Sequence, residues 1–160
     1  MNNIDIFKAI SGLVFAQAYE SFPLKIDLSP SEIAISLSDE FWDESQRQIA
    51  ENQFEYVRNR SPIGLAKPTI EWLGSAGLIT FDGYRDGVFL GVTLTAKGLE
   101  SIESKEEHGF NLLSAVKDLA VDELKDQARK RLKEVFSEAL SWSVEKSPTI
   151  IQAVSNYASQ

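Results

Sequence analysis

The stretch from residue 66 to residue 102 constrains the fold most, because it predicts a helix, a β-hairpin and a second helix in that order. It reads AKPTIEWLGSAGLITFDGYRDGVFLGVTLTAKGLESI. Gly77 is typical of the position after a helix C-terminus, and Thr95 is typical of an N-cap. Between them, two runs of β-forming residues flank Asp-Gly pairs, which supply the positive φ that tight turns need. The second run, 88–94, has the strand period, which indicates one buried face.

The preceding residues predict the other parts of a small α+β domain. Apolar spacing over residues 4–19 predicts a largely buried helix, and alternation over 24–28 predicts a short strand. Ser29, followed by a proline, predicts the start of another helix. The apolar faces of these elements are expected to share a core containing Leu13, Ile33, Leu37, Ile70, Leu73, Leu78, Val92 and Leu94.

Two phrases in this region, EWLGSAGLI and LTAKGLESI, resemble the winged-helix superfamily in the style of the MarR-like and PadR-like bacterial regulators. The residues that carry the match are Leu73, Ala76, Gly77, Leu78, Ile79, Leu94, Thr95, Lys97, Gly98 and Leu99. The resemblance implies a mainly α (α+β) fold, a winged helix-turn-helix with a two-stranded wing. It makes the helix before the wing the recognition helix. An ordinary hairpin between two helices is the alternative.

The chain is expected to divide into a winged-helix domain at 1–104 and a C-terminal helical appendage at 105–160. Within the first part, residues at about 41–60 predict an inserted amphipathic helix. A minimal helix-turn-helix has only a short turn at this place. The insertion therefore departs from the simple pattern.

The appendage has an apolar stripe that steps by three or four residues, as in an α-helix. The helix is expected to run unbroken over about 110–146, or to break near Asp122, and Ser147-Pro148 is expected to end it. A stripe this long leaves an apolar face exposed, so a homodimer is expected. The residues expected near the dimer interface are Leu124, Leu132, Val135 and Trp142.

Charge and composition restrict the classes of function. The net charge is −8 with a pI near 4.7, and no part of the chain is basic overall, whereas duplex binding calls for a basic face. The absence of cysteine excludes a disulfide scaffold and a thiolate metal site. No apolar run is long enough for a transmembrane helix, and the N-terminus lacks the features of a signal peptide, so a cytoplasmic protein is expected.

The candidates for contact with double-stranded DNA surround the predicted recognition helix and wing. They are Arg58, Arg60, Lys67, Thr69 and Arg85. In a winged helix these places meet the DNA backbone and the minor groove, but scattered surface charge is the alternative. Pro68 is expected to begin or kink the helix. Because no arginine, asparagine or glutamine is placed for bidentate base readout, only modest sequence specificity is expected.

A second candidate surface is acidic and aromatic. It consists of Asp39, Glu40, Phe41, Trp42, Asp43 and Glu44. A charged rim around aromatic residues suits a basic protein partner. The alternative is a solvated helix N-terminus, where carboxylates favour the helix dipole.

The sequence does not indicate an enzyme, a cofactor or a metal site. The single histidine, His108, lies in a polar run that reads as a loop, and no GxSxG or P-loop motif is present. The densest basic run, Arg129, Lys130, Arg131 and Lys133, is expected to be a solvated helix face with pairing along the helix.

Two functions follow from these observations. The first is a winged-helix DNA-binding transcriptional regulator that acts as a dimer. The second is an acidic winged-helix protein-interaction module, such as an adaptor, a phage or plasmid accessory protein, or an immunity protein that neutralises a basic toxin. A fold resemblance alone does not decide between them.

Overall fold

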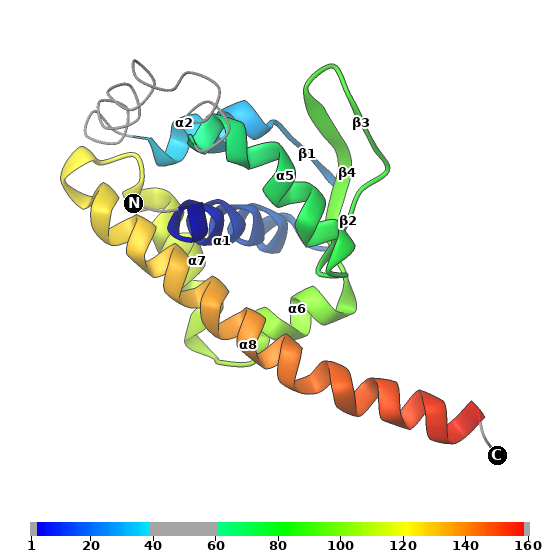
Figure 1. Ribbon diagram of the computed structural model, residues 1–160. Helices are drawn as coiled ribbons and strands as arrows, with labels where there is room; N and C mark the ends of the chain where they lie inside the picture. The colour runs from blue at the N-terminus through cyan, green and yellow to red at the C-terminus, as the bar shows by residue number, and fades with distance from the viewer. Residues whose placement is uncertain (1–2, 39–60, 159–160) are drawn as a thin grey trace.

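Helix α1 (Asn3–Ser21) runs through the middle of the protein, and four other helices pack against it (Figure 1). The computed structural model describes residues 3–38 and 61–158, with side chains up to Lys146. Every residue from Ala9 to Ala16 is buried, so α1 is covered on all sides rather than along one stripe. The sequence prediction of a largely buried first helix is confirmed.

The protein is α+β, mostly helical with a small antiparallel sheet. None of the described helices is both long and apolar enough to cross a membrane. After α1 the elements are β1 (Ile26–Leu28), α2 (Pro30–Leu37), α5 (Pro62–Ser75), β2 (Ile79–Thr80), β3 (Gly83–Arg85), β4 (Val88–Leu94), α6 (Ala96–Glu103), α7 (Glu107–Asp118), a 3₁₀ helix (Asp122–Leu124) and α8 (Lys125–Ala158).

Side-chain caps fix where three of these helices begin. The hydroxyl of Ser29 accepts from the backbone N–H of Glu32 at 3.3 Å, and the hydroxyl of Thr95 accepts from that of Gly98 at 3.0 Å. Both caps were predicted from the sequence and are confirmed. The third, Ser61, caps α5, so this helix begins at Pro62 and Pro68 lies inside it. The expectation that Pro68 opens the helix is therefore wrong.

Strand β4 is the centre of the sheet. It pairs antiparallel with β1, β2 and β3, and the order along the main path is β1-β4-β2. The turn between β3 and β4 consists of Asp86 and Gly87, whose φ values are 54° and 79°. Positive φ at both positions is what a two-residue type I′ hairpin requires. The hairpin predicted from the Asp-Gly pairs is confirmed, with its turn at the second pair.

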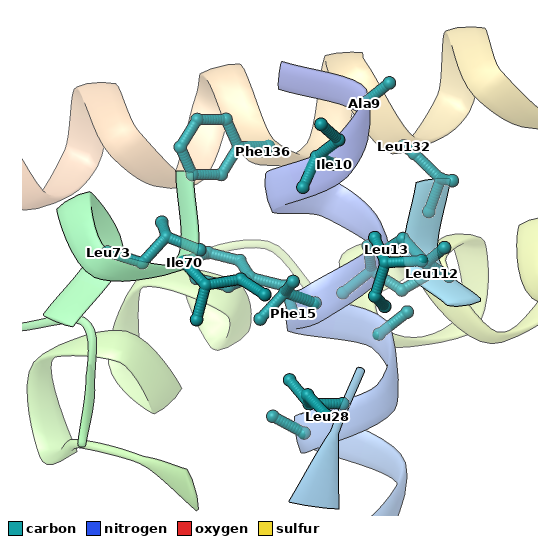
Figure 2. Packing of buried hydrophobic residues seen from close by; sticks show 14 of the residues in the cluster. Ala9, Ile10, Leu13, Phe15, Leu28, Ile70, Leu73, Leu112, Leu132 and Phe136 are labelled. Carbon is teal, nitrogen blue, oxygen red and sulfur yellow. The ribbon is translucent and has the colours of Figure 1, made fainter. Parts of the chain in front are cut away.

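Buried side chains from both halves of the chain form one cluster (Figure 2). All eight residues predicted for the core belong to it. Helices α7 and α8 pack on α1, and the ring centroid of Phe136 in α8 lies 5.3 Å from that of Phe15 in α1. At Gly12, a Cβ atom would lie 2.4 Å from the backbone oxygen of Leu132, so the two helices touch there. The core is therefore continuous across residue 104.

The C-terminal helices differ from the sequence expectation in two respects. The predicted long helix is interrupted near Asp122, where a 3₁₀ helix separates α7 from α8, and this interruption was one of the two predicted alternatives. Helix α8 then continues through Ser147-Pro148 instead of ending there. In Figure 1 its last turns extend away from the rest of the protein.

The dimer positions predicted on α8 need correction. Leu132 and Val135 have exposed fractions of 0% and 3%. Their apolar stripe packs within the same chain, where α8 contacts α1 and α7, so these two side chains are not available to a partner. Leu124 and Trp142 are half-buried. The periodic stripe correctly indicated a buried helix face, but its partner is the chain's own core.

Candidate functional site

Helix α5 and the β3–β4 hairpin form the candidate binding face. The hairpin projects from the body beside α5 (Figure 1). Lys67 of α5 joins the two elements, because its Nζ lies 4.6 Å from the centroid of the Tyr84 ring. Tyr84 also packs against Phe89 of β4, with ring centroids 4.7 Å apart. A cation over an aromatic ring is attracted by the ring quadrupole, so this contact helps to hold the hairpin against the helix.

Two of the predicted DNA-contacting residues are exposed on this face. Lys67 lies on the outer side of α5, and Arg85 lies at the end of β3 next to the turn. Successive side chains of a strand point to opposite faces, so Arg85 leaves β3 on the side opposite Tyr84. The structure therefore brings Lys67 to Tyr84, while Arg85 occupies the tip of the hairpin.

Thr69 does not belong to this face. Its exposed fraction is 4%, and its hydroxyl donates to the backbone oxygen of Leu65 at 2.6 Å. The prediction that Thr69 contacts nucleic acid is wrong, because the helix turns this side chain inward. The other predicted residues lie outside the described part of the chain: Arg58, Arg60, Asp39, Glu40, Phe41, Trp42, Asp43 and Glu44, with the predicted inserted helix.

The charges on the candidate face are nearly balanced. Lys25 Nζ lies 3.2 Å from a carboxylate oxygen of Asp82, and Lys67 Nζ lies 3.9 Å from one of Glu71. All four side chains are about half exposed or more, so these ion pairs contribute little to stability. They do reduce the positive potential that the lysines present to an approaching ligand. Arg85 adds a further positive charge at the hairpin tip.

Beside this face lies an apolar hollow of about 400 Å³, which we call the α1–α5 groove. It is lined by Asn3, Ile4, Phe7, Leu65, Pro68, Thr69 and Trp72. Phe7 and Trp72 meet edge to face, with ring centroids 5.1 Å apart. Trp72 was not among the residues predicted for a binding site. The signal available in the sequence was that Trp72, a large aromatic residue, lies beside the stripe of buried α5 residues rather than within it, which favours partial exposure.

In the basic run at 129–133, Arg129, Arg131 and Lys133 contact other helices, and Lys130 is exposed as expected. Arg129 has an exposed fraction of 4%, and it donates to the backbone oxygen of Leu37 at 2.9 Å. Lys125 donates to that of Ser38 at 2.8 Å. Positive groups at the last carbonyls of a helix satisfy them and favour the helix dipole. These two side chains of α8 therefore hold the C-terminus of α2.

Arg131 and Lys133 connect α8 to two other helices. Arg131 donates to the hydroxyl of Ser114 at 2.7 Å and pairs with Asp118, both in α7. Lys133 lies 3.9 Å from a carboxylate oxygen of Asp5 in α1. The expected pairing within a solvated helix face is wrong for these residues, because they connect α8 to its neighbours.

His108 is buried near the start of α7, with an exposed fraction of 2%. The prediction that it lies in a loop is wrong. Its Nδ1 donates to the backbone oxygen of Ile102 at 3.0 Å, because a carbonyl oxygen can only accept. Its Nε2 lies 2.6 Å from Oε2 of Glu138, and Lys105 Nζ lies 3.1 Å from the same oxygen. Hydrogen bonds from His108 and Lys105 lower the pKa of Glu138 below its ordinary value of 4.5.

Replacing Glu138 with glutamine should reduce the loss of stability that acid causes. A carboxyl group whose folded-state pKa is lowered stabilises the fold above its unfolded-state pKa of 4.5. That contribution is lost as the pH falls through the lower folded value. Urea unfolding of the wild type and E138Q should therefore differ more at pH about 6 than at pH about 3. E134Q, which removes an exposed carboxylate one turn earlier on α8, is the control and should keep the wild-type dependence on pH. An E138Q profile that follows the wild type at all pH values would contradict the assignment.

Comparison with known proteins gives no match to a family model, a curated protein or a solved structure. Within the described part of the chain, no group of three or more His, Asp or Glu side chains is arranged to hold a metal ion.

Proposed function

We propose that this protein is a winged-helix transcriptional regulator that binds duplex DNA with α5 and the β3–β4 hairpin. The observation that carries the proposal is the placement of the hairpin. It follows α5 directly in the chain, projects beside it, and is held to it by Lys67 and Tyr84. The three-stranded order β1-β4-β2, with helices before and after the hairpin, supports a winged helix over an isolated hairpin between two helices.

In this proposal α5 enters the major groove, and the hairpin lies along the backbone and the minor groove. Lys67 contacts phosphate from the first half of α5, and Arg85 contacts phosphate or the minor groove from the hairpin tip. The exposed residues of α5 are Ile63, Lys67, Pro68, Glu71, Trp72 and Ser75. None of them is an arginine, asparagine or glutamine, whose side chains can form two hydrogen bonds to one base. Specificity is therefore expected to be modest.

Alanine at Lys67 or Arg85 should weaken duplex binding and flatten its dependence on salt. Each phosphate contact that is lost should reduce the slope of log K against log salt by about 0.9. Gel shifts with the upstream region of the protein's own gene, over a series of salt concentrations, measure both effects. K130A removes an exposed lysine of α8 and serves as the control, since Lys130 is not part of the α5–hairpin face. It should keep the wild-type affinity and slope.

A protein partner is the second candidate, and the charge balance of the face favours it. With Lys25 near Asp82 and Lys67 near Glu71, the face attracts a polyanion only weakly. A winged-helix face that is nearly neutral also suits a protein interface, whose centre is depleted in charge. If no duplex from its own locus binds even at low salt, the DNA proposal fails and the same face becomes the candidate for a protein.

A further inference from the structure

We propose that the α1–α5 groove binds the last turns of α8 from a second copy of this chain, and that two copies exchange these helix ends. The groove is open and apolar. Ile4 is 58% exposed and Trp72 is 43% exposed at its rim. The hydroxyl of Thr69 is already bonded to Leu65, so it does not call for a polar ligand. Exposed apolar surface of this kind marks interaction sites in soluble proteins.

The groove is formed before anything binds in it. Phe7, which lines it, packs edge to face against both Trp72 and Phe136, with ring centroids 5.1 and 5.5 Å apart. Aromatic contacts of this geometry fix the orientation of the rings. A helix that docks here therefore need not order the side chains of the groove, which lowers the entropic cost of binding.

Helix α8 supplies an occupant of matching character. The helix has 34 residues, which is about 50 Å at the usual rise. Among its described side chains, none after Ser143 is buried, and Val144 is 60% exposed. The sequence beyond Lys146, SPTIIQAVSNYASQ, has no charged residue, and its apolar residues Ile150, Ile151, Val154 and Tyr157 recur at the spacing typical of an amphipathic helix. A projecting helix end with an apolar face is marginal in water unless that face is covered.

The end of α8 cannot reach the groove of its own chain, so the helix end that binds there comes from another copy. Phe136 of α8 packs against Phe7, one of the residues that line the groove. Val154 lies further along the same continuous helix, roughly 27 Å from Phe136 at the usual rise per residue. A continuous helix cannot turn back over that distance to reach its own groove. In a two-fold dimer the contact is made twice, because each copy gives its helix end and receives its partner's.

Sedimentation tests this exchange, because the full chain should be a dimer at roughly tens of micromolar. A chain that ends after Lys146 loses the helix end but keeps all described buried residues, so it should be a folded monomer. I4E places a charge at the rim of the groove and should also give a monomer. I35E is the matched control, since Ile35 is 65% exposed on α2 and is not part of the groove lining. It should remain a dimer.

A disulfide test identifies the contact itself, because the chain has no cysteine of its own. When a tagged I4C chain is mixed with an untagged V154C chain under oxidising conditions, a covalent pair should form. I35C mixed with V154C should not give it. A wild-type monomer, a shortened chain that still dimerises, or failure of the I4C–V154C pair to form would each overturn the proposal. Duplex binding is measured separately, so a monomer that binds DNA would overturn only the dimer.

Discussion

Truncating Phe136 to alanine should lower the free energy of unfolding by about 3–5 kcal/mol. Phe136 is fully buried in α8, and its ring contacts Phe15 and Phe7 of α1 edge to face. Figure 2 shows Phe136 among the packed side chains of the core, so the substitution removes apolar surface and should leave a cavity there. Urea unfolding followed by circular dichroism measures the change.

Val144 provides the matched control for this substitution, because it lies on the same helix and is 60% exposed. V144A should change the free energy of unfolding by less than about 0.5 kcal/mol, as surface substitutions usually do. If F136A were as mild as V144A, α8 would not be packed on α1, and the single core that joins the two halves of the chain would be wrong.

Leu73→Ala should cost about 2–5 kcal/mol, the next largest effect. Leu73 is fully buried on the inner side of α5, in the same cluster as Ile70 and the side chains of α1. The measurement is again the free energy of unfolding in urea. Ile63 lies on the same helix and is 64% exposed, so I63A serves as the control. An unchanged unfolding midpoint for L73A would show that α5 does not pack through this face.

The sequence predicted the parts of the fold that local patterns determine. Ser29 and Thr95 were identified as N-caps because their neighbours along the chain complete the cap. Gly77 was identified as the residue after the C-cap of α5, because glycine readily adopts the positive φ of that position. Its φ in the structure is 75°. Each of these signals lies within a few residues of the feature that it predicts.

Features that depend on distant parts of the chain were not predicted. Arg129 bonds to Leu37, which is 92 residues away, and no local pattern distinguishes this arginine from an exposed one. His108 is buried and bonds to Glu138, 30 residues away, although its neighbours in the sequence are polar. For the same reason, the spacing on α8 predicted that Leu132 would be buried but not which helix would cover it.

The candidate site was predicted only in part. Lys67 and Arg85 were placed correctly on exposed positions of α5 and the hairpin, because amphipathic period and turn chemistry are local. Thr69 was misplaced because the helix was expected to begin or kink at Pro68, whereas it begins at Pro62, and Thr69 lies with Ala66, Ile70 and Leu73 on its buried side. The contact of Lys67 with Tyr84 depends on how the hairpin packs against α5, and the spacing of apolar residues along a helix does not predict that packing.

The central position of α1 also governs the order in which this chain can fold. Its residues are synthesised first, yet Phe15 finds its partner Phe136 roughly 120 residues later in translation. The central turns of α1, which are buried on all sides in the folded protein, therefore lack part of their cover until α8 has left the ribosome. During that interval α1 exposes apolar surface that the folded protein buries. A ribosome that stalls before α8 would release a chain that is prone to aggregate.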